Sequence, residues 1–222
     1  MARLGKYPVL QVALDFTSLE KALVVALKAW ENGADILEAG TPLIKSLGMV
    51  AVRMLRRVFP EAVVLADMKT FDTGALETGM AGRNGADIST VMGLADDSTI
   101  SSAAEEAHRL GMMLEADLMS HPDPVSRASE LRGLGVDIVG VHVGIDVQKR
   151  RALTAAEQAE LVSRVKEAFR GPVAVAGGLR EDTVRYVLDA GADIVVVGSA
   201  ITRASDPGEA ARRIASIVAE YR

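Results

Sequence analysis

Short apolar runs alternate with amphipathic, helix-like stretches along the whole chain. A four-residue motif, Gly-Ala-Asp-Ile or Gly-Val-Asp-Ile, recurs four times at intervals of roughly fifty residues. Each copy places a glycine and an aspartate just before an apolar run. The copies are Gly33–Ile36, Gly85–Ile88, Gly135–Ile138 and Gly191–Ile194. In each copy the glycine can end a helix in a left-handed conformation, and the residues after it can open a strand.

Four further apolar runs lie between the copies and bring the number of expected strands to eight. These runs are Val9–Asp15, Val63–Lys69, Met112–Leu118 and Val173–Gly178. Eight strands that alternate with eight helical segments are the pattern of an α/β fold of the (β/α)8 or TIM-barrel type. Because 222 residues suffice for one such barrel and leave little over, we predict a single (β/α)8 domain over residues 1–222.

Capping residues locate four of the expected helix starts. Two threonine–glutamate pairs fit the capping box, and two aspartate–proline pairs place a carboxylate before a proline suited to the first turn. These pairs are Thr17 with Glu20, Thr154 with Glu157, Asp123 with Pro124, and Asp206 with Pro207. The longest irregular connection is expected at Ile145–Leu153, where Lys149, Arg150 and Arg151 form either a mobile flap or a solvated charged loop.

Charge and composition exclude several classes of partner. A net charge of -5 and a pI near 5.3 provide no basic surface for nucleic acid, and the apolar runs are too short to span a bilayer. The chain has no cysteine, and Met1–Pro8 lacks the apolar core of a signal peptide. We therefore expect a cytoplasmic protein with neither a nucleic acid nor a membrane as partner.

Polar residues close several of the expected strands, where a buried parallel strand should otherwise end apolar. They are Asp15, Glu38, Asp67, Lys69, Glu115, Asp117 and His142. Any one of them could have a structural role: Asp15 could cap the next helix, and Glu115 could pair with a neighbour outside the barrel. Together they indicate an active site at the mouth where the strands end.

The segment Asp67–Asp72 contains three charged residues within six positions, the highest concentration among these strand ends. Residues two apart in a strand share a face, so Asp67 and Lys69 should point the same way, and Asp72 follows in the turn. Two carboxylates around the ammonium would keep Lys69 charged and ready to stabilise negative charge on a substrate oxygen. A structural ion-pair cluster is the alternative interpretation.

A metal site is expected beside this group. Glu38 and Asp67 end neighbouring strands, so their carboxylates could converge on one hard cation, Mg²⁺, with Mn²⁺ as the alternative. Zinc is disfavoured, because His108, His121 and His142 are scattered and no thiolate is present. Of the three histidines, only His142 ends a strand.

Glycines mark the ends of the last two strands and indicate a phosphate site. Bare backbone amides after these strands commonly bind phosphate in this fold, and an arginine can add a bidentate contact. The candidate phosphate ligands are Gly177, Gly178, Gly198, Ser199 and Arg203. The alternative is that the glycines only make tight turns.

Nine segments carry a resemblance that spans nearly the whole chain. They are Val12–Asp15, Glu38–Lys45, Asp67–Asp72, Gly85–Asp87, Asp117–Leu118, Asp123–Val125, His142–Asp146, Ala176–Gly178 and Gly198–Ile201. In these segments the chain resembles the orotidine 5'-monophosphate decarboxylase superfamily, and within it the 3-hexulose-6-phosphate synthases. Two positions depart from the pattern: Phe71 stands where these synthases often have methionine, and Ser199 replaces a second glycine. Neither departure removes a required functional group.

The resemblance implies a magnesium-dependent aldolase, a lyase of carbohydrate metabolism that fixes formaldehyde in the ribulose monophosphate pathway. Such an enzyme would form an enediolate from D-ribulose 5-phosphate and add it reversibly to formaldehyde, giving 3-hexulose 6-phosphate. The implied metal ligands are Glu38 and Asp67, and the implied catalytic residues are His142 for proton transfer with Lys69, Asp72, Asp15 and Asp117. The family also implies a homodimer with shared active sites, in which Asp72 reaches into the partner's site.

Two alternatives stay open from the sequence. A 3-keto-L-gulonate 6-phosphate decarboxylase would share the metal site and the phosphate site, but its pattern has arginine three residues after the histidine, where this chain has Ile145. A non-catalytic sugar-phosphate-binding barrel should have lost part of the acid, lysine and histidine set, which is complete here.

Overall fold

The structure, a computed structural model, describes residues 4, 6–150 and 155–222. Within this part of the chain, eight parallel strands close into a barrel in the order of the sequence, β1 pairing with β8. The strands are β1 (Val9–Leu14), β2 (Ile36–Ala39), β3 (Val63–Thr70), β4 (Ile88–Met92), β5 (Met113–Asp117), β6 (Ile138–His142), β7 (Val173–Ala176) and β8 (Ile194–Val197). The predicted (β/α)8 fold is confirmed.

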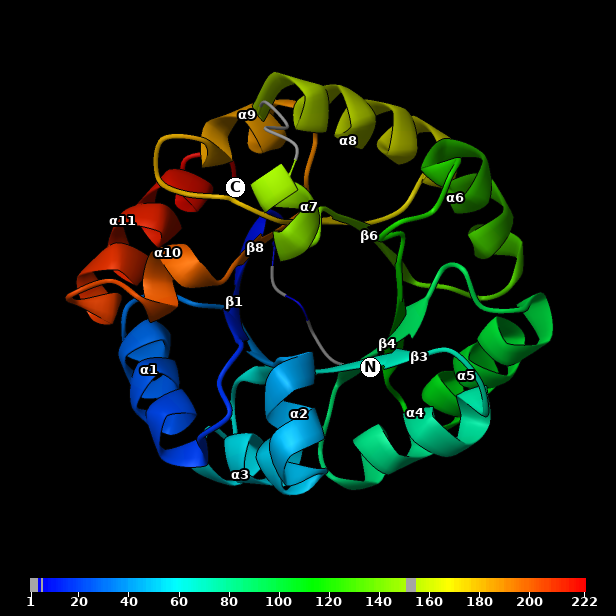
Figure 1. The fold of residues 1–222 in the computed structure, drawn as a ribbon, viewed down its shortest axis with the longest axis horizontal. Helices are drawn as coiled ribbons and strands as arrows, with labels where there is room; N and C mark the ends of the chain where they lie inside the picture. Colours follow the sequence, from blue (N-terminus) through cyan, green and yellow to red (C-terminus); the bar gives the residue numbers. More distant parts are fainter. Residues whose placement is uncertain (1–3, 5, 151–154) are drawn as a thin grey trace.

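Most of the helices surround the barrel and cover its outer face, as the view in Figure 1 shows. Those described are α1 (Leu19–Glu31), α2 (Thr41–Leu47), α3 (Val50–Val58), α4 (Gly74–Arg83), α5 (Asp97–Arg109), α6 (Pro124–Gly133), α7 (Ile145–Arg150), α8 (Ala155–Phe169), α9 (Val184–Asp189), α10 (Ser199–Thr202) and α11 (Pro207–Ala219). None of the helices in the described residues is both long and apolar enough to cross a bilayer.

Alternation along each strand creates two separate cores. Side chains that point outward, such as Leu10, Leu37 and Leu114, pack against the helices in a large cluster. Side chains that point inward, among them Ile36 and Ile138, fill the lower part of the barrel. Because the inward positions turn polar toward the carboxyl ends of the strands, the barrel is apolar at its base and polar at its mouth.

The four copies of the repeated motif have the same structural function. Each aspartate lies just before an even-numbered strand and accepts the backbone N–H at or near the start of the preceding odd-numbered strand, at 2.7 or 2.8 Å. Each also pairs with a basic side chain. The pairs are Asp35 with Arg222, Asp87 with Arg56, Asp137 with His108, and Asp193 with Lys166. The repeat therefore ties neighbouring strands together at the base of the barrel, opposite the mouth.

Two local predictions are wrong. Helix α1 is capped by Ser18, whose side chain accepts the amide of Lys21, so Thr17 lies one residue outside the helix. The stretch Ile145–Arg150 is helix α7 and not irregular. The sequence did not reveal this helix, because its six residues make fewer than two turns and show no periodic pattern. Thr154 and Arg151 lie outside the described residues.

The two aspartate–proline predictions are confirmed. Asp123 caps α6 by accepting the amide of Ser126, and Asp206 caps α11 by accepting the amides of Gly208 and Glu209.

Candidate active site

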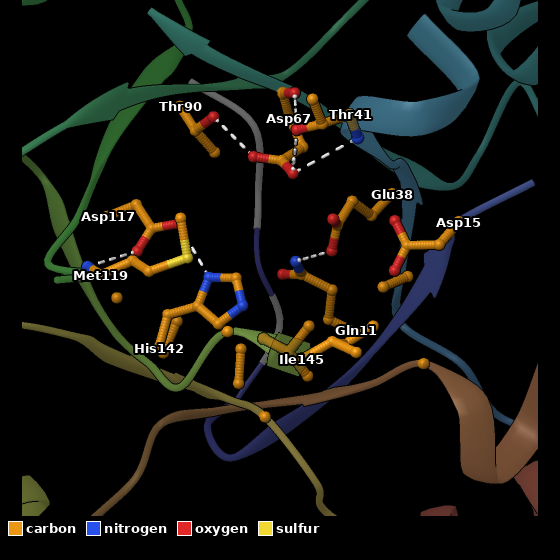
Figure 2. A pocket seen from close by; sticks show the side chains of 18 of the residues that line it. Gln11, Asp15, Glu38, Thr41, Asp67, Thr90, Asp117, Met119, His142 and Ile145 are labelled. Carbon is orange, nitrogen blue, oxygen red and sulfur yellow. Dashed lines mark hydrogen bonds and ion pairs between the residues drawn. The ribbon is translucent and has the colours of Figure 1, made fainter. Parts of the chain in front are cut away.

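A cavity of about 680 Å³ opens at the carboxyl ends of the strands. All of the polar strand-end residues line it: Asp15, Glu38, Asp67, Lys69, Glu115, Asp117 and His142. Figure 2 shows Asp117 and His142 on one side of this space and Glu38 and Asp15 on the other. The sequence-based expectation that these residues face one mouth is therefore confirmed.

Asp117 joins the side chains of Lys69 and His142 at the wall of the cavity. One of its oxygens, Oδ2, accepts from Lys69 Nζ at 2.9 Å and lies 2.8 Å from His142 Nδ1, while Oδ1 accepts the amide of Met119 at 2.8 Å. Burial alone would raise the pKa of Asp117, but hydrogen bonds and charges from His142 and Lys69 lower this pKa to about 2. The carboxylate is thus ionised, and His142 must donate from Nδ1, which leaves Nε2 as the nitrogen able to take a proton.

Lys69 is held in a strained backbone conformation. Its φ of 47° lies in the left-handed region, and the pairing of β3 with β4 shifts register between Ala66 and Thr70. The backbone amide of Lys69 donates to Thr90 Oγ1 instead of a strand partner. Burial lowers the pKa of Lys69, but the carboxylates of Asp67 and Asp117 outweigh it and raise this pKa above its ordinary value. The ammonium therefore stays charged inside the cavity.

The second carboxylate beside Lys69 is Asp117 and not the predicted Asp72. Lys69 Nζ lies 3.0 Å from the carboxylate of Asp67, as expected from the strand alternation. Asp72 is exposed, does not line the cavity, and accepts the amide of Thr73 at 2.7 Å. Asp72 follows β3 and lies outside the cavity, whereas Asp117 comes from β5, which only β4 separates from β3.

Three carboxylates gather where β1, β2 and β3 end. Burial and the charges of Asp67 and Asp15 raise the pKa of Glu38, and burial and the charge of Asp67 raise the pKa of Asp15. Glu38 accepts from Gln11 Nε2 at 2.7 Å, and Asp67 accepts from Thr41 Oγ1 at 2.7 Å. Asp15 lies close against Gly40, where a Cβ would be 2.2 Å from Asp15 Oδ1 and would require the carboxylate to move.

These carboxylates form a hard-oxygen donor set with excess negative charge. Within the described residues, no three His, Cys, Asp or Glu side chains are close enough together to hold a metal by themselves. Mg²⁺ needs only one or two protein carboxylates when substrate oxygens and water complete its shell. Mutual repulsion among Asp15, Glu38 and Asp67 would be relieved by a cation, so the residues present fit such an ion.

The loops after β7 and β8 form the part of the rim next to β1, where a Cβ at Gly198 would lie 3.8 Å from Asp15 Oδ2. Gly177 and Gly178 have φ values of 111° and 71°, and a Cβ at Gly177 would lie 2.5 Å from the carbonyl oxygen of Val143. Gly198 precedes α10, which Ser199 begins. The cavity brings the predicted phosphate ligands together: Gly177, Gly178, Gly198, Ser199 and Arg203 all line it.

Some residues of the site escaped the sequence analysis, and some candidates lie elsewhere. Gln11, Thr41 and Thr90 line the cavity, and the only signal for Gln11 was a polar residue inside an apolar run. Glu115 points into the barrel and not toward an outside partner. His108 pairs with Asp137, and His121 Nδ1 accepts the amide of Asp123, so neither is at the cavity.

A family model and several known proteins match nearly the whole chain. The model of the orotidine 5'-phosphate decarboxylase / HUMPS family matches residues 8–214. The 3-hexulose-6-phosphate synthase of Mycobacterium gastri is 41% identical over 218 residues, covering 95% of this chain and 99% of that protein. A crystal structure of a 3-hexulose-6-phosphate synthase superposes with a TM-score of 0.90 at 39% identity, over 95% of this chain and 99% of the other.

A second kind of relative shares the fold at lower identity. The 3-keto-L-gulonate-6-phosphate decarboxylase of Vibrio cholerae O1 biovar El Tor str. N16961 has a TM-score of 0.85 at 24% identity, over 97% of this chain and 99% of the other. At that identity the likeness concerns the fold alone.

Proposed function

This chain is an enzyme that belongs to the orotidine 5'-phosphate decarboxylase / HUMPS family, and on that premise we propose that it condenses D-ribulose 5-phosphate with formaldehyde to 3-hexulose 6-phosphate. The reaction is reversible and passes through an enediolate of the sugar phosphate. The observation that carries the proposal is the pair of contacts at Asp117 Oδ2, which orient His142 and Lys69 toward one cavity.

His142 is the proton-transfer residue of this proposal. Removing a proton beside a ketone needs a base that is neutral near pH 7 and properly aimed. Asp117 holds Nδ1 of the imidazole, so Nε2 is left with a lone pair, and Figure 2 shows the ring projecting into the cavity. The charged ammonium of Lys69 lies against the same carboxylate and stabilises negative charge that develops on a substrate oxygen.

Glu38 and Asp67 would hold a divalent cation, Mg²⁺ or Mn²⁺, at the other wall. When bound, such an ion supplies a positive charge for the oxyanion of the enediolate. The protein side of this arrangement is already ordered: Thr41 and Thr90 donate to the two oxygens of Asp67, and Gln11 donates to Glu38. Asp15 adds further negative charge and a hydrogen-bond acceptor at the same wall.

The phosphate of the substrate would bind at the rim formed by the loops after β7 and β8. The proposed ligands are the backbone amides of Gly177, Gly178, Gly198 and Ser199 together with the guanidinium of Arg203, all from residues that line the cavity. The phosphate would anchor one end of the sugar at this rim and leave the carbonyl end between the acidic wall and His142. Positioning of this kind places the reacting carbon next to the base.

Ile145 favours the synthase over the 3-keto-L-gulonate 6-phosphate decarboxylase. It is the first residue of α7, it lines the cavity, and 53% of its surface is exposed. The decarboxylase pattern has arginine at this position, where a guanidinium could assist protonation. The sec-butyl side chain of isoleucine carries no charge and no hydrogen-bond donor, so it cannot do so.

A homodimer is part of the proposal. Leu76 and Met80 share one face of α4, because they are four residues apart, and they are 58% and 39% exposed. Phe71, 61% exposed, precedes that helix next to Asp72. We call Phe71, Leu76 and Met80 the α4 patch. A second copy of the chain seated on this patch would cover it and bring its own Asp72 toward the cavity.

Purified protein incubated with D-ribulose 5-phosphate, formaldehyde and Mg²⁺ tests the proposal. We expect formaldehyde to be consumed, and addition of a chelator to stop its consumption. Release of carbon dioxide from 3-keto-L-gulonate 6-phosphate, without formaldehyde consumption, would identify the decarboxylase instead. Absence of both reactions would refute both assignments.

A further inference from the structure

Glu115 lies at the floor of the cavity, and the proton transfer, metal binding and phosphate binding proposed above do not involve it. It is on β5, two residues before Asp117, so both side chains point into the barrel, with Glu115 one layer deeper. Only 6% of its surface is exposed, yet it lines the cavity. In the described residues, no donor lies within hydrogen-bond distance of its buried Oε2 atom.

Gly140 places the Glu115 carboxyl below His142. Gly140 is two residues before His142 on β6 and therefore shares its inward face. A Cβ at Gly140 would lie 2.8 Å from Glu115 Oε1, so the carboxyl occupies the space that a side chain at this position would take. His142 stands above this point and Glu115 below it, both facing the same cavity.

The carboxyl of Glu115 carries a proton at neutral pH. Burial raises its pKa to about 8, and the charges of Asp117 and Asp67 add to the effect while that of Lys69 opposes it. A neutral carboxylic acid that donates to no acceptor in the protein can donate its proton to an oxygen of a bound substrate.

We propose that Glu115 is a further catalytic residue, which binds the aldehyde oxygen at the cavity floor and protonates it as the carbon–carbon bond forms. The enediolate carbon attacks the aldehyde carbon, and the electron pair of the carbonyl π bond moves to the aldehyde oxygen. Glu115 gives its proton to that oxygen, which becomes the new hydroxyl group, and is left as a carboxylate. The proton that His142 removed from the sugar phosphate then returns to Glu115 through solvent, so the cycle is balanced.

This inference rests on the proposed function and concerns only its second half. Enediolate formation needs His142 and is measured without aldehyde, as exchange of the substrate proton beside the carbonyl for deuterium from solvent. Carbon–carbon bond formation is measured as formaldehyde consumption. The two measurements on one preparation therefore separate the role of Glu115 from that of the rest of the site.

The test variant is Glu115→Gln, which keeps the shape of the side chain but cannot release a proton. We expect deuterium exchange to stay within about twofold of wild type and formaldehyde consumption to fall about 100-fold, the usual size of a general-acid contribution. Retained exchange also shows that the variant is folded. Unchanged formaldehyde consumption, or an equal fall in both activities, would overturn the role of Glu115.

A second variant, Gly140→Ala, moves the carboxyl without removing it. The added methyl group meets the flexible end of Glu115, so we expect formaldehyde consumption to fall and exchange to persist. Consumption that does not fall would count against the proposed contact. If the wild-type protein consumes no formaldehyde at all, the proposed function fails and this inference fails with it.

Discussion

The buried carboxyl of Glu115 should make folding stability depend on pH in a predictable way. The ordinary pKa of its side chain is 4.5, and in the folded protein burial raises this pKa to about 8. Between these two values the folded protein keeps a proton that the unfolded chain has released. The contribution of Glu115 to the free energy of unfolding is therefore fully present below about pH 4.5 and is lost as the pH rises toward 8.

The size of the effect follows from the pKa difference. Each pH unit inside this window removes about 1.4 kcal/mol, so a change from pH 5 to pH 8 removes about 4 kcal/mol from the wild-type protein. Glu115→Gln has no such proton to lose. Relative to wild type, the variant should therefore gain about 4 kcal/mol of stability over this range.

Urea unfolding of both proteins at pH 5, 6, 7 and 8, at one protein concentration, measures this difference. The pKa values of Asp15 and Glu38 are also raised, but these residues are present in both proteins, so their contributions cancel. The constant cost of burying an amide in place of a carboxyl cancels as well, because only the change with pH is compared. Parallel curves for the two proteins, with a difference constant to within about 1 kcal/mol, would refute the reasoning.

Three further predictions concern the base of the barrel, the α4 patch and the phosphate rim. Asp87→Ala removes the acceptor of the Val64 amide and the partner of Arg56, and should lower the free energy of unfolding by about 2 to 3 kcal/mol in denaturant titrations. Glu181→Ala, which removes the exposed pair with Arg213, should lower it by less than about 1 kcal/mol. Met80→Glu should give a monomer in light scattering and lose formaldehyde consumption, whereas Val24→Glu, at an exposed apolar position on α1, should change neither. Arg203→Ala should raise the KM for D-ribulose 5-phosphate about tenfold, as expected for one lost charge-assisted contact, and an unchanged KM would place the phosphate elsewhere.

The barrel was predictable because its determinants are local. The glycine before each repeated aspartate ends a helix, and an apolar run of strand length follows. Together with the four runs between the copies, these make the eight strands of the closed barrel. Short-range geometry also brought Asp67 and Lys69 to one face. Where two neighbouring residues could cap the same helix, as with Thr17 and Ser18, the sequence pattern alone could not decide between them.

The hydrogen-bond partners of the site residues were harder to predict from the sequence, because the contacts join strands that are far apart along the chain. Asp117 is 48 residues from Lys69, and the pairing of β4 with both β3 and β5 brings it to the ammonium that Asp72 was expected to hold. The irregular backbone at Lys69 arises from pairing with β4 and leaves no mark in the sequence. The inward direction of Glu115, by contrast, follows from the same alternation that places Asp117, and could have been derived from it.

Deuterium exchange into D-ribulose 5-phosphate, without formaldehyde, tests the central claim most directly. The wild-type protein with Mg²⁺ should exchange the proton on the carbon next to the carbonyl, and His142→Ala should reduce the exchange rate by at least about 100-fold, because the imidazole held by Asp117 is the base. A wild-type protein that exchanges nothing, or a His142→Ala variant that exchanges at the wild-type rate, would contradict the account.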